Sequence, residues 1–227
     1  MRVVIYYSNT GESYAVANAL AARLEWPLSS LWELPEGRYE TAVLVFPVHA
    51  QGIPDAVRDL LPRLSVEHLA AVATYGRISP GNALFELQKQ FGRALIVGAY
   101  VPTAHAYLPG DSRFVAVPEL ELLVQKILHP SPVRIPRRFK NPLATLFPGL
   151  RARVGVHLSK NERCTGCGEC TVRCPHGGIE NGSPTRRCIR CLGCVANCPE
   201  EALEFRLHPL LRFYLSGKRR DDWILYL

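Results

Sequence analysis

All eight cysteines of this 227-residue chain fall in two short runs with the same spacing. The first run holds Cys164, Cys167, Cys170 and Cys174, and the second holds Cys188, Cys191, Cys194 and Cys198. Each run reads C-x2-C-x2-C-x3-C-P, and the second begins 24 residues after the first. Thiolates at this spacing are typical ligands of a cubane cluster of iron and sulfide. The sequence therefore predicts iron–sulfur chemistry in a duplicated half-domain.

The spacing also predicts how the thiols are shared between two clusters. Three cysteines two residues apart can enclose three corners of one cluster, while the fourth cysteine of such a run ligates the other cluster. We therefore assign two crossed sets of ligands: Cys164, Cys167, Cys170 with Cys198, and Cys188, Cys191, Cys194 with Cys174.

Zinc sites and disulfides are the alternative uses of these cysteines. Zinc sites usually combine C-x2-C pairs across a long gap, whereas here four cysteines share each run. Disulfides need an oxidising compartment, and the N-terminus turns polar after Tyr7, unlike an export signal. We therefore expect iron–sulfur clusters in a cytoplasmic protein.

Residues 156–206 resemble the bacterial ferredoxins that hold two [4Fe-4S] clusters. A small α+β domain is expected, with strands at 156–159 and 203–205 paired to each other. Three arginines lie close to the cysteines in sequence, namely Arg173, Arg187 and Arg190. Their positive charge is expected to raise the cluster reduction potentials.

An anion-binding loop is predicted near the other end of the chain. Residues 2–7 have the β-branched and aromatic character of a buried parallel strand, and 14–24 has a helical pattern. The six residues between 8 and 13 contain three hydroxyl side chains and one glycine. A strand, such a loop and a helix direct backbone N–H groups and the positive helix end toward an anion. The alternative is a helix cap without a ligand.

Apolar runs that alternate with helical segments predict a doubly wound parallel sheet. The five predicted strands are 2–7, 28–34, 41–46, 69–74 and 94–101. The predicted helices are 14–24, 55–64, 84–91 and 115–128. The loops rich in Gly, Pro, His and Tyr follow the carboxyl ends of the strands, where such sheets bind ligands.

On these loops the N-terminal half resembles flavodoxins, because residues 8–13 match the phosphate-loop pattern [ST]-x-[ST]-G-x-[ST]. The whole chain is similar to the ferredoxin–flavodoxin fusion proteins of anaerobic prokaryotes. The resemblance implies bound FMN, a flavodoxin-like sheet of order 2-1-3-4-5 and electron transfer. The residues that it assigns to FMN are Ser8, Asn9, Thr10, Gly11, Glu12, Ser13, Pro47, Val48, His49, Ala50, Thr74, Tyr75 and Gly76.

Two positions depart from the family pattern. His49 stands where members often carry Tyr, and residues 101–107 replace a Met-Pro-x-Asn-Tyr segment. His49 is a candidate proton donor to the flavin, with a loop histidine as the alternative. Tyr75 is a candidate to stack on the flavin ring, with a core residue as the alternative. His105 and Tyr107 are further candidates for this site.

The net charge of +7 does not point to nucleic acid. Two oxidised clusters would add about four negative charges and a flavin phosphate about two. Basic residues gather at 134–140, at Arg151 and Arg153, and at 218–220, without a reading helix or interleaved aromatics. They are interpreted as charge compensation and a solvated linker, and the alternative is a docking patch for an acidic redox partner. The longest uncharged stretch, 94–110, is too short to span a membrane.

Four segments are predicted: a flavodoxin-like domain at 1–129, a Pro/Arg-rich linker at 130–155, a ferredoxin domain at 156–206 and a tail at 207–227. The tail is expected to pack on the protein or on a partner, and a homodimer is compatible with the sequence. We expect two [4Fe-4S] clusters and FMN to pass electrons to a redox partner. The alternatives are a flavin-dependent reductase of a small organic substrate and an accessory subunit of a larger redox complex.

Overall fold

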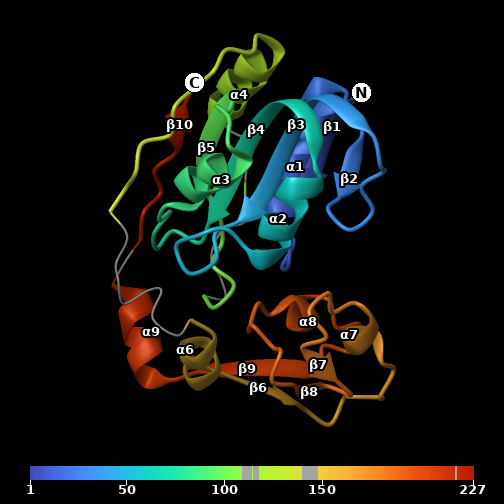
Figure 1. The fold of residues 1–227 in the computed structure, drawn as a ribbon. Helices are drawn as coiled ribbons and strands as arrows, with labels where there is room; N and C mark the ends of the chain where they lie inside the picture. Colours follow the sequence, from blue (N-terminus) through green and yellow to red (C-terminus); the bar gives the residue numbers. More distant parts are fainter. Residues whose placement is uncertain (109–113, 115–117, 140–147, 218) are drawn as a thin grey trace. The chain divides into compact units, whose positions relative to one another are not determined.

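The computed structural model describes residues 1–108, 114, 118–139, 148–217 and 219–227 (Figure 1). The chain divides into two compact units, each built from more than one segment. The sheet unit comprises Met1–His105, Gly110–Thr145 and Arg219–Leu227. The cysteine unit comprises Ala106–Pro109 and Leu146–Lys218. The chain therefore passes between the units four times, whereas the sequence suggested successive segments.

The sheet unit is a mixed α/β structure with a largely parallel sheet of six strands. Five parallel strands run in the order β2-β1-β3-β4-β5, and β10 pairs antiparallel with β5. The strands are β1 (Arg2–Tyr6), β2 (Leu28–Ser30), β3 (Arg38–Pro47), β4 (Ser65–Tyr75), β5 (Val97–Pro102) and β10 (Ile224–Tyr226). The prediction of five strands is corrected to six, because residues from the far end of the chain add one at the edge.

Helices cover both faces of this sheet (Figure 1). Alternate residues of a strand face opposite sides, so Val4 packs with α1 (Glu12–Leu24) and α4 (Pro118–Leu128). Its neighbour Ile5 packs with α2 (Asp55–Leu60) and α3 (Ala83–Phe91) on the other face. A short 3-10 helix, η1 (Leu61–Arg63), follows α2. The central strands are buried on both sides, which explains their unbroken apolar sequences.

The region predicted as a linker contains ordered structure. Ile135 is buried in the sheet unit, and its N–H donates to the Gln88 side-chain oxygen at 2.8 Å. Asn82 bonds the backbone of Arg138 twice, as donor and as acceptor, each at 2.6 Å. Residues 148–155 form α6 (Pro148–Gly155), a helix that the sequence did not predict. Its Pro-Gly start and weak amphipathic pattern explain why the periodicity gave no signal.

The cysteine unit is built on two short antiparallel ladders. β6 (Val156–Lys160) pairs with β9 (Leu203–Leu207), and β7 (Ile179–Glu180) pairs with β8 (Ser183–Pro184). Its helices are α6, α7 (Glu169–Val172), α8 (Gly193–Ala196) and α9 (Pro209–Ser216). The fully buried apolar cluster has five members, which are Val156, Leu158, Ile179, Leu192 and Leu203. So small a core is typical of domains in which metal ligation supplies much of the folding free energy.

Across the described ranges, the helices are all too short or too polar to cross a membrane.

Candidate metal centre and anion-binding loop

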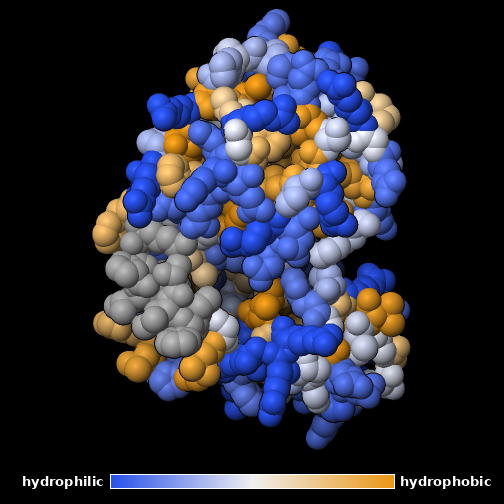
Figure 2. Space-filling model, in the orientation of Figure 1, coloured by the Kyte–Doolittle hydropathy of each residue, from blue (hydrophilic) through white to orange (hydrophobic). Residues whose placement is uncertain are grey.

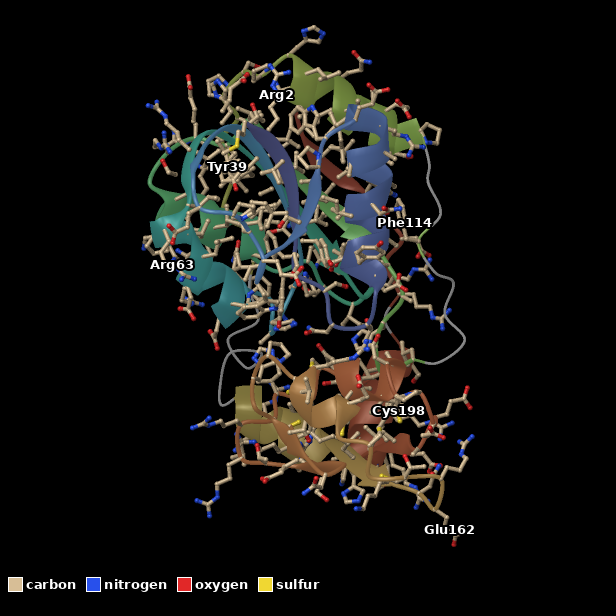
Figure 3. All side chains as sticks on the ribbon, turned by 90° about the vertical axis from the view of Figure 1, so that its right-hand side faces the viewer. Arg2, Tyr39, Arg63, Phe114, Glu162 and Cys198 are labelled. Carbon is tan, nitrogen blue, oxygen red and sulfur yellow. The ribbon has the colours of Figure 1, made fainter. Side chains whose placement is uncertain are left out.

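The first predicted ligand set lines one pocket of the cysteine unit. Cys164, Cys167, Cys170 and Cys198 all face it, together with the loop backbone around Gly166. Most sulfur atoms of the chain, drawn in yellow, gather in this unit (Figure 3). The pocket therefore combines three thiols of the first run with the fourth thiol of the second run, as the crossed assignment requires.

The second predicted set also lies close together. Burial, and then the nearby thiols of Cys191, Cys188 and Cys174, raise the pKa of Cys194 to about 12. The pKa of Cys191 is raised by burial first and then by Cys174 and Cys188. The Cys191 and Cys194 thiols therefore resist losing their protons, and iron would reverse that preference because metals bind the thiolate. In the described ranges, no three His, Cys, Asp or Glu residues form a group that could hold a single metal ion.

The two cysteine runs share one backbone design. Gly166 and Arg190, 24 residues apart, are both left-handed, with φ of 75° and 60°. Gly168 and Leu192, at the same offset, have φ of 78° and 61°. Each of the latter pair precedes a helix of four residues, α7 or α8. The repeat seen in the cysteine spacing therefore extends to the loop conformation between the cysteines.

The fourth cysteine of each run is held in the same way. The N–H of Gly178 donates to Cys174 Sγ at 3.2 Å, and that of Ala202 donates to Cys198 Sγ at 3.3 Å. These pairs again lie 24 residues apart. Hydrogen bonds to cluster sulfur ligands stabilise the reduced state, because it carries more negative charge. Both fourth cysteines therefore have a local donor suited to a thiolate ligand.

Of the three arginines near the cysteines, Arg190 is the most enclosed. Its Nε donates to the Val156 carbonyl oxygen at 3.0 Å. Its Nη1 is buried and has no hydrogen-bond partner among the described residues. Arg173 instead pairs with Glu169 at 2.6 Å on the surface, and Arg187 is exposed. A buried N–H that lacks a protein acceptor fits a site that receives an anionic group.

Tyr107 belongs to the cysteine unit rather than to the loops of the sheet. Its hydroxyl donates to the Arg190 carbonyl oxygen at 2.7 Å. Its ring packs beside Phe205, with centroids 6.3 Å apart. Burial raises its pKa, and the thiols of Cys191 and Cys188 add to the rise. The sequence suggested Tyr107 as a flavin contact, but the structure places it against the second cysteine run.

The predicted anion loop joins β1 to α1. Gly11 is left-handed, with φ of 94°, and its N–H donates to Ser8 Oγ at 3.2 Å. Ser13 Oγ and Thr74 Oγ1 are buried and lie 2.7 Å apart, which links the loop to the end of β4. A side chain at Gly11 would meet nothing within 4 Å, so this part of the loop is open. The loop and the start of α1 can therefore hold an anion.

The carboxylate of Glu12, inside this loop, is engaged elsewhere. It accepts the N–H of Ala104 at 3.3 Å and that of Phe114, labelled in Figure 3, at 3.4 Å. These bonds hold the negative charge of Glu12 on backbone donors that follow β5. Glu12 therefore connects the loop after β1 with the segment after β5.

The loop after β3 contacts the anion loop through His49. Asn9 Nδ2 and His49 Nε2 lie 3.2 Å apart, and the Tyr7 and His49 rings meet edge to face at 6.0 Å. The N–H of Val48 donates to the Thr74 carbonyl oxygen at 2.8 Å. The residues predicted to bind FMN, from 8–13, 47–50 and 74–76, thus lie on neighbouring ends of β1, β3 and β4.

Tyr75 is buried in the core of the sheet unit and only 2% exposed. Its hydroxyl donates to the carbonyl oxygens of Asp222 at 2.7 Å and Arg220 at 3.3 Å. Burial, and then Asp222 and Asp221, raise its pKa to about 12. The Arg77 side chain pairs with Asp221 at 2.7 Å. These contacts hold the segment that leads into β10, a role that the sequence did not predict for Tyr75.

Comparison with known proteins identifies one domain. Residues 160–180 match the family described as the 4Fe-4S binding domain. No curated protein matches the chain significantly. The match confirms an iron–sulfur domain at the first cysteine run, which is the class of site that the cysteine spacing predicted. An iron–sulfur domain of this kind indicates electron transfer.

Proposed function

We propose that this protein is an electron-transfer iron–sulfur flavoprotein. Two [4Fe-4S] clusters are held by the cysteine unit, and FMN is held at the carboxyl edge of the sheet unit. The clusters carry single electrons, and FMN links one-electron to two-electron chemistry. Electrons then pass to a redox partner protein.

The observation that carries the proposal is the 24-residue repeat in the conformation of the two runs. The matched family covers only the first run. The second run repeats its left-handed residues, its short helix and its N–H···S bond. A segment that repeats these three local features supports a second cluster at Cys188, Cys191, Cys194 and Cys174.

The case for FMN rests on the edge of the parallel sheet. The strand order β2-β1-β3-β4-β5 is the flavodoxin-like order, which binds FMN at the switch point beside β1 and β3. The open loop at Gly11 and the 13-residue helix that follows it suit the phosphate. His49 and the backbone of 48–50 lie beside that loop and would contact the ring.

Iron, acid-labile sulfide and released flavin, measured per chain on protein purified without oxygen, test the proposal. We expect about eight irons and one FMN. Four irons would limit the protein to one cluster, and eight irons without flavin after incubation with FMN would remove the flavin from the proposal.

A matched pair of variants separates the flavin from the clusters. Thr10→Asp adds a negative charge to the loop and is expected to abolish FMN binding while the iron content stays unchanged. Thr10→Ser keeps the hydroxyl and is expected to retain FMN. Equal flavin content in both variants would place the FMN phosphate elsewhere.

A further inference from the structure

Helices α6 and α9 of the cysteine unit expose an unusual amount of apolar surface. Leu210 and Phe213 of α9 are 74% and 80% exposed, and Leu150 and Val154 of α6 are 58% and 67% exposed. Figure 2 shows hydrophobic atoms on the surface where α9 lies in Figure 1. Single exposed apolar residues are common, but four on two neighbouring helices indicate an interaction site.

The two helices are joined to each other where they meet the β6–β9 ladder. α6 runs directly into β6, and α9 begins two residues after β9 ends. The N–H of His208 donates to the Gly155 carbonyl oxygen at 2.9 Å, and Leu211 packs against Gly155. Leu211 packs against the apolar cluster of the unit, and Leu215 is buried. One side of α9 is therefore packed within the protein, and Leu210 and Phe213 on its other side remain exposed and can contact another partner.

The segments of the cysteine unit that contain these helices carry charges of one sign. Residues 148–161 and 205–217 hold five Lys and Arg residues and no Asp or Glu. Within α6 and α9 the charged residues are Arg151, Arg153 and Arg212. A surface of this kind attracts an anionic partner over distances up to about the Debye length.

We propose that α6 and α9 bind the surface of an anionic lipid membrane. Leu and Phe side chains that project from a helix beside arginines suit the boundary between headgroups and acyl chains. The arginines would meet anionic headgroups, each adding to the attraction. The apolar side chains project outward from helices, and lipid accommodates projecting side chains without a complementary pocket. Binding would be peripheral, since no described helix could span a bilayer.

Vesicle co-sedimentation of the cluster-loaded full chain tests this proposal. We expect binding to vesicles of phosphatidylglycerol and phosphatidylcholine, at least about tenfold weaker binding to phosphatidylcholine alone, and release by high salt. The double variant Leu210→Ser/Phe213→Ser is expected to weaken binding about tenfold or more while iron content is unchanged. The variant Arg151→Gln/Arg212→Gln is expected to lose the preference for anionic vesicles.

Val172→Ser is the matched control, because Val172 lies in the same unit on α7 and is 85% exposed. It is expected to bind vesicles as the parent protein does. Failure to bind anionic vesicles at low salt would overturn the proposal, and so would an equal loss in Val172→Ser. If the parent binds no vesicles and Leu210→Ser/Phe213→Ser converts a dimer to a monomer, the surface joins two copies of the chain and the lipid proposal is wrong. If the chain binds an acidic protein but does not bind vesicles, the lipid proposal is also wrong.

Discussion

The two cysteine runs have the same spacing but different surroundings. In the first run the left-handed positions are Gly166 and Gly168 on an open surface, where a side chain would meet nothing within 4 Å. In the second run they are Arg190 and Leu192, and Leu192 is buried. The first loop needs glycine only for its backbone. The second loop has non-glycine residues in the left-handed backbone conformation, which is strained. Their side chains offset this strain, because Leu192 packs in the core and Arg190 forms a hydrogen bond and carries a charge.

The difference indicates that duplicated halves have taken separate roles. Tyr107 and Arg190 enclose the second run, whereas Cys167 of the first run is exposed. Burial lowers a cluster potential, while a nearby positive charge raises it. We therefore expect two clusters of unequal potential and unequal access, with the first run closer to solvent and to any partner protein.

Cysteine substitutions give the largest expected effect and test whether the runs are crossed. Cys164→Ala/Cys198→Ala removes two ligands of one proposed cluster, so about four irons should remain. Cys164→Ala/Cys174→Ala removes one ligand from each and should leave almost none. Iron analysis of anaerobically purified protein decides between them. The reverse result would show that each run ligates its own cluster.

Removal of Tyr107 should affect the second run selectively. Tyr107→Ala deletes a partly buried ring and is expected to destabilise the unit by up to about 3 kcal/mol, which should speed loss of the second cluster to a chelator. Tyr107→Phe keeps the ring and loses one hydrogen bond, worth about 1 kcal/mol. Spectroscopic comparison of the two clusters during chelation measures this. Faster loss of the first cluster would contradict the placement of Tyr107.

Glycine substitution should affect the first run through its backbone alone. Gly168→Ala forces a side chain into a left-handed conformation and is expected to cost about 1–2 kcal/mol. Gly217→Ala is the control, because it also has open space but a φ of −89°. Denaturant unfolding of the cluster-loaded protein provides the measurement. Equal stability of the two variants would show that the loop does not require the left-handed conformation at 168.

Charge removal should give the smallest effect. Arg190→Gln is expected to lower the potential of the second cluster by tens of millivolts, on the order set by a nearby charge. Arg173→Gln should shift the first cluster less, because Arg173 is exposed and paired with Glu169. Spectroelectrochemical titration measures both. A larger shift from Arg173→Gln would show that burial does not govern the influence of these charges.

The sequence predicted those parts of the molecule whose signals are local. Cysteine spacing carries the ligand pattern within one loop, so the iron–sulfur domain was predicted correctly. The apolar runs at 41–46 and 69–74 belong to strands that are buried on both faces, so the sequence predicted the central parts of β3 and β4. Both strands extend beyond these runs. A largely parallel α/β sheet was predicted correctly for this reason.

The features that the sequence did not predict depend on distant contacts. β10 is three residues long and is defined by its pairing with β5, more than 120 residues earlier. Tyr107 follows β5 in the chain, yet its hydrogen bond is to residue 190. The pattern of apolar and polar residues near these segments predicts neither contact. The 24-residue repeat did contain one unused signal, since it aligns Arg190 and Leu192 with glycines and thereby marks the left-handed positions.

The position of β10 has a consequence for biosynthesis. During translation β5 is complete while residues 224–226 are still unmade, so one edge of the parallel sheet has no partner. An unpaired edge can pair with other chains, and at about 5–20 residues per second the delay lasts several seconds or more. All eight cysteines leave the ribosome before β10 does. The edge of the sheet is therefore closed only after the polypeptide that receives the iron has been synthesised.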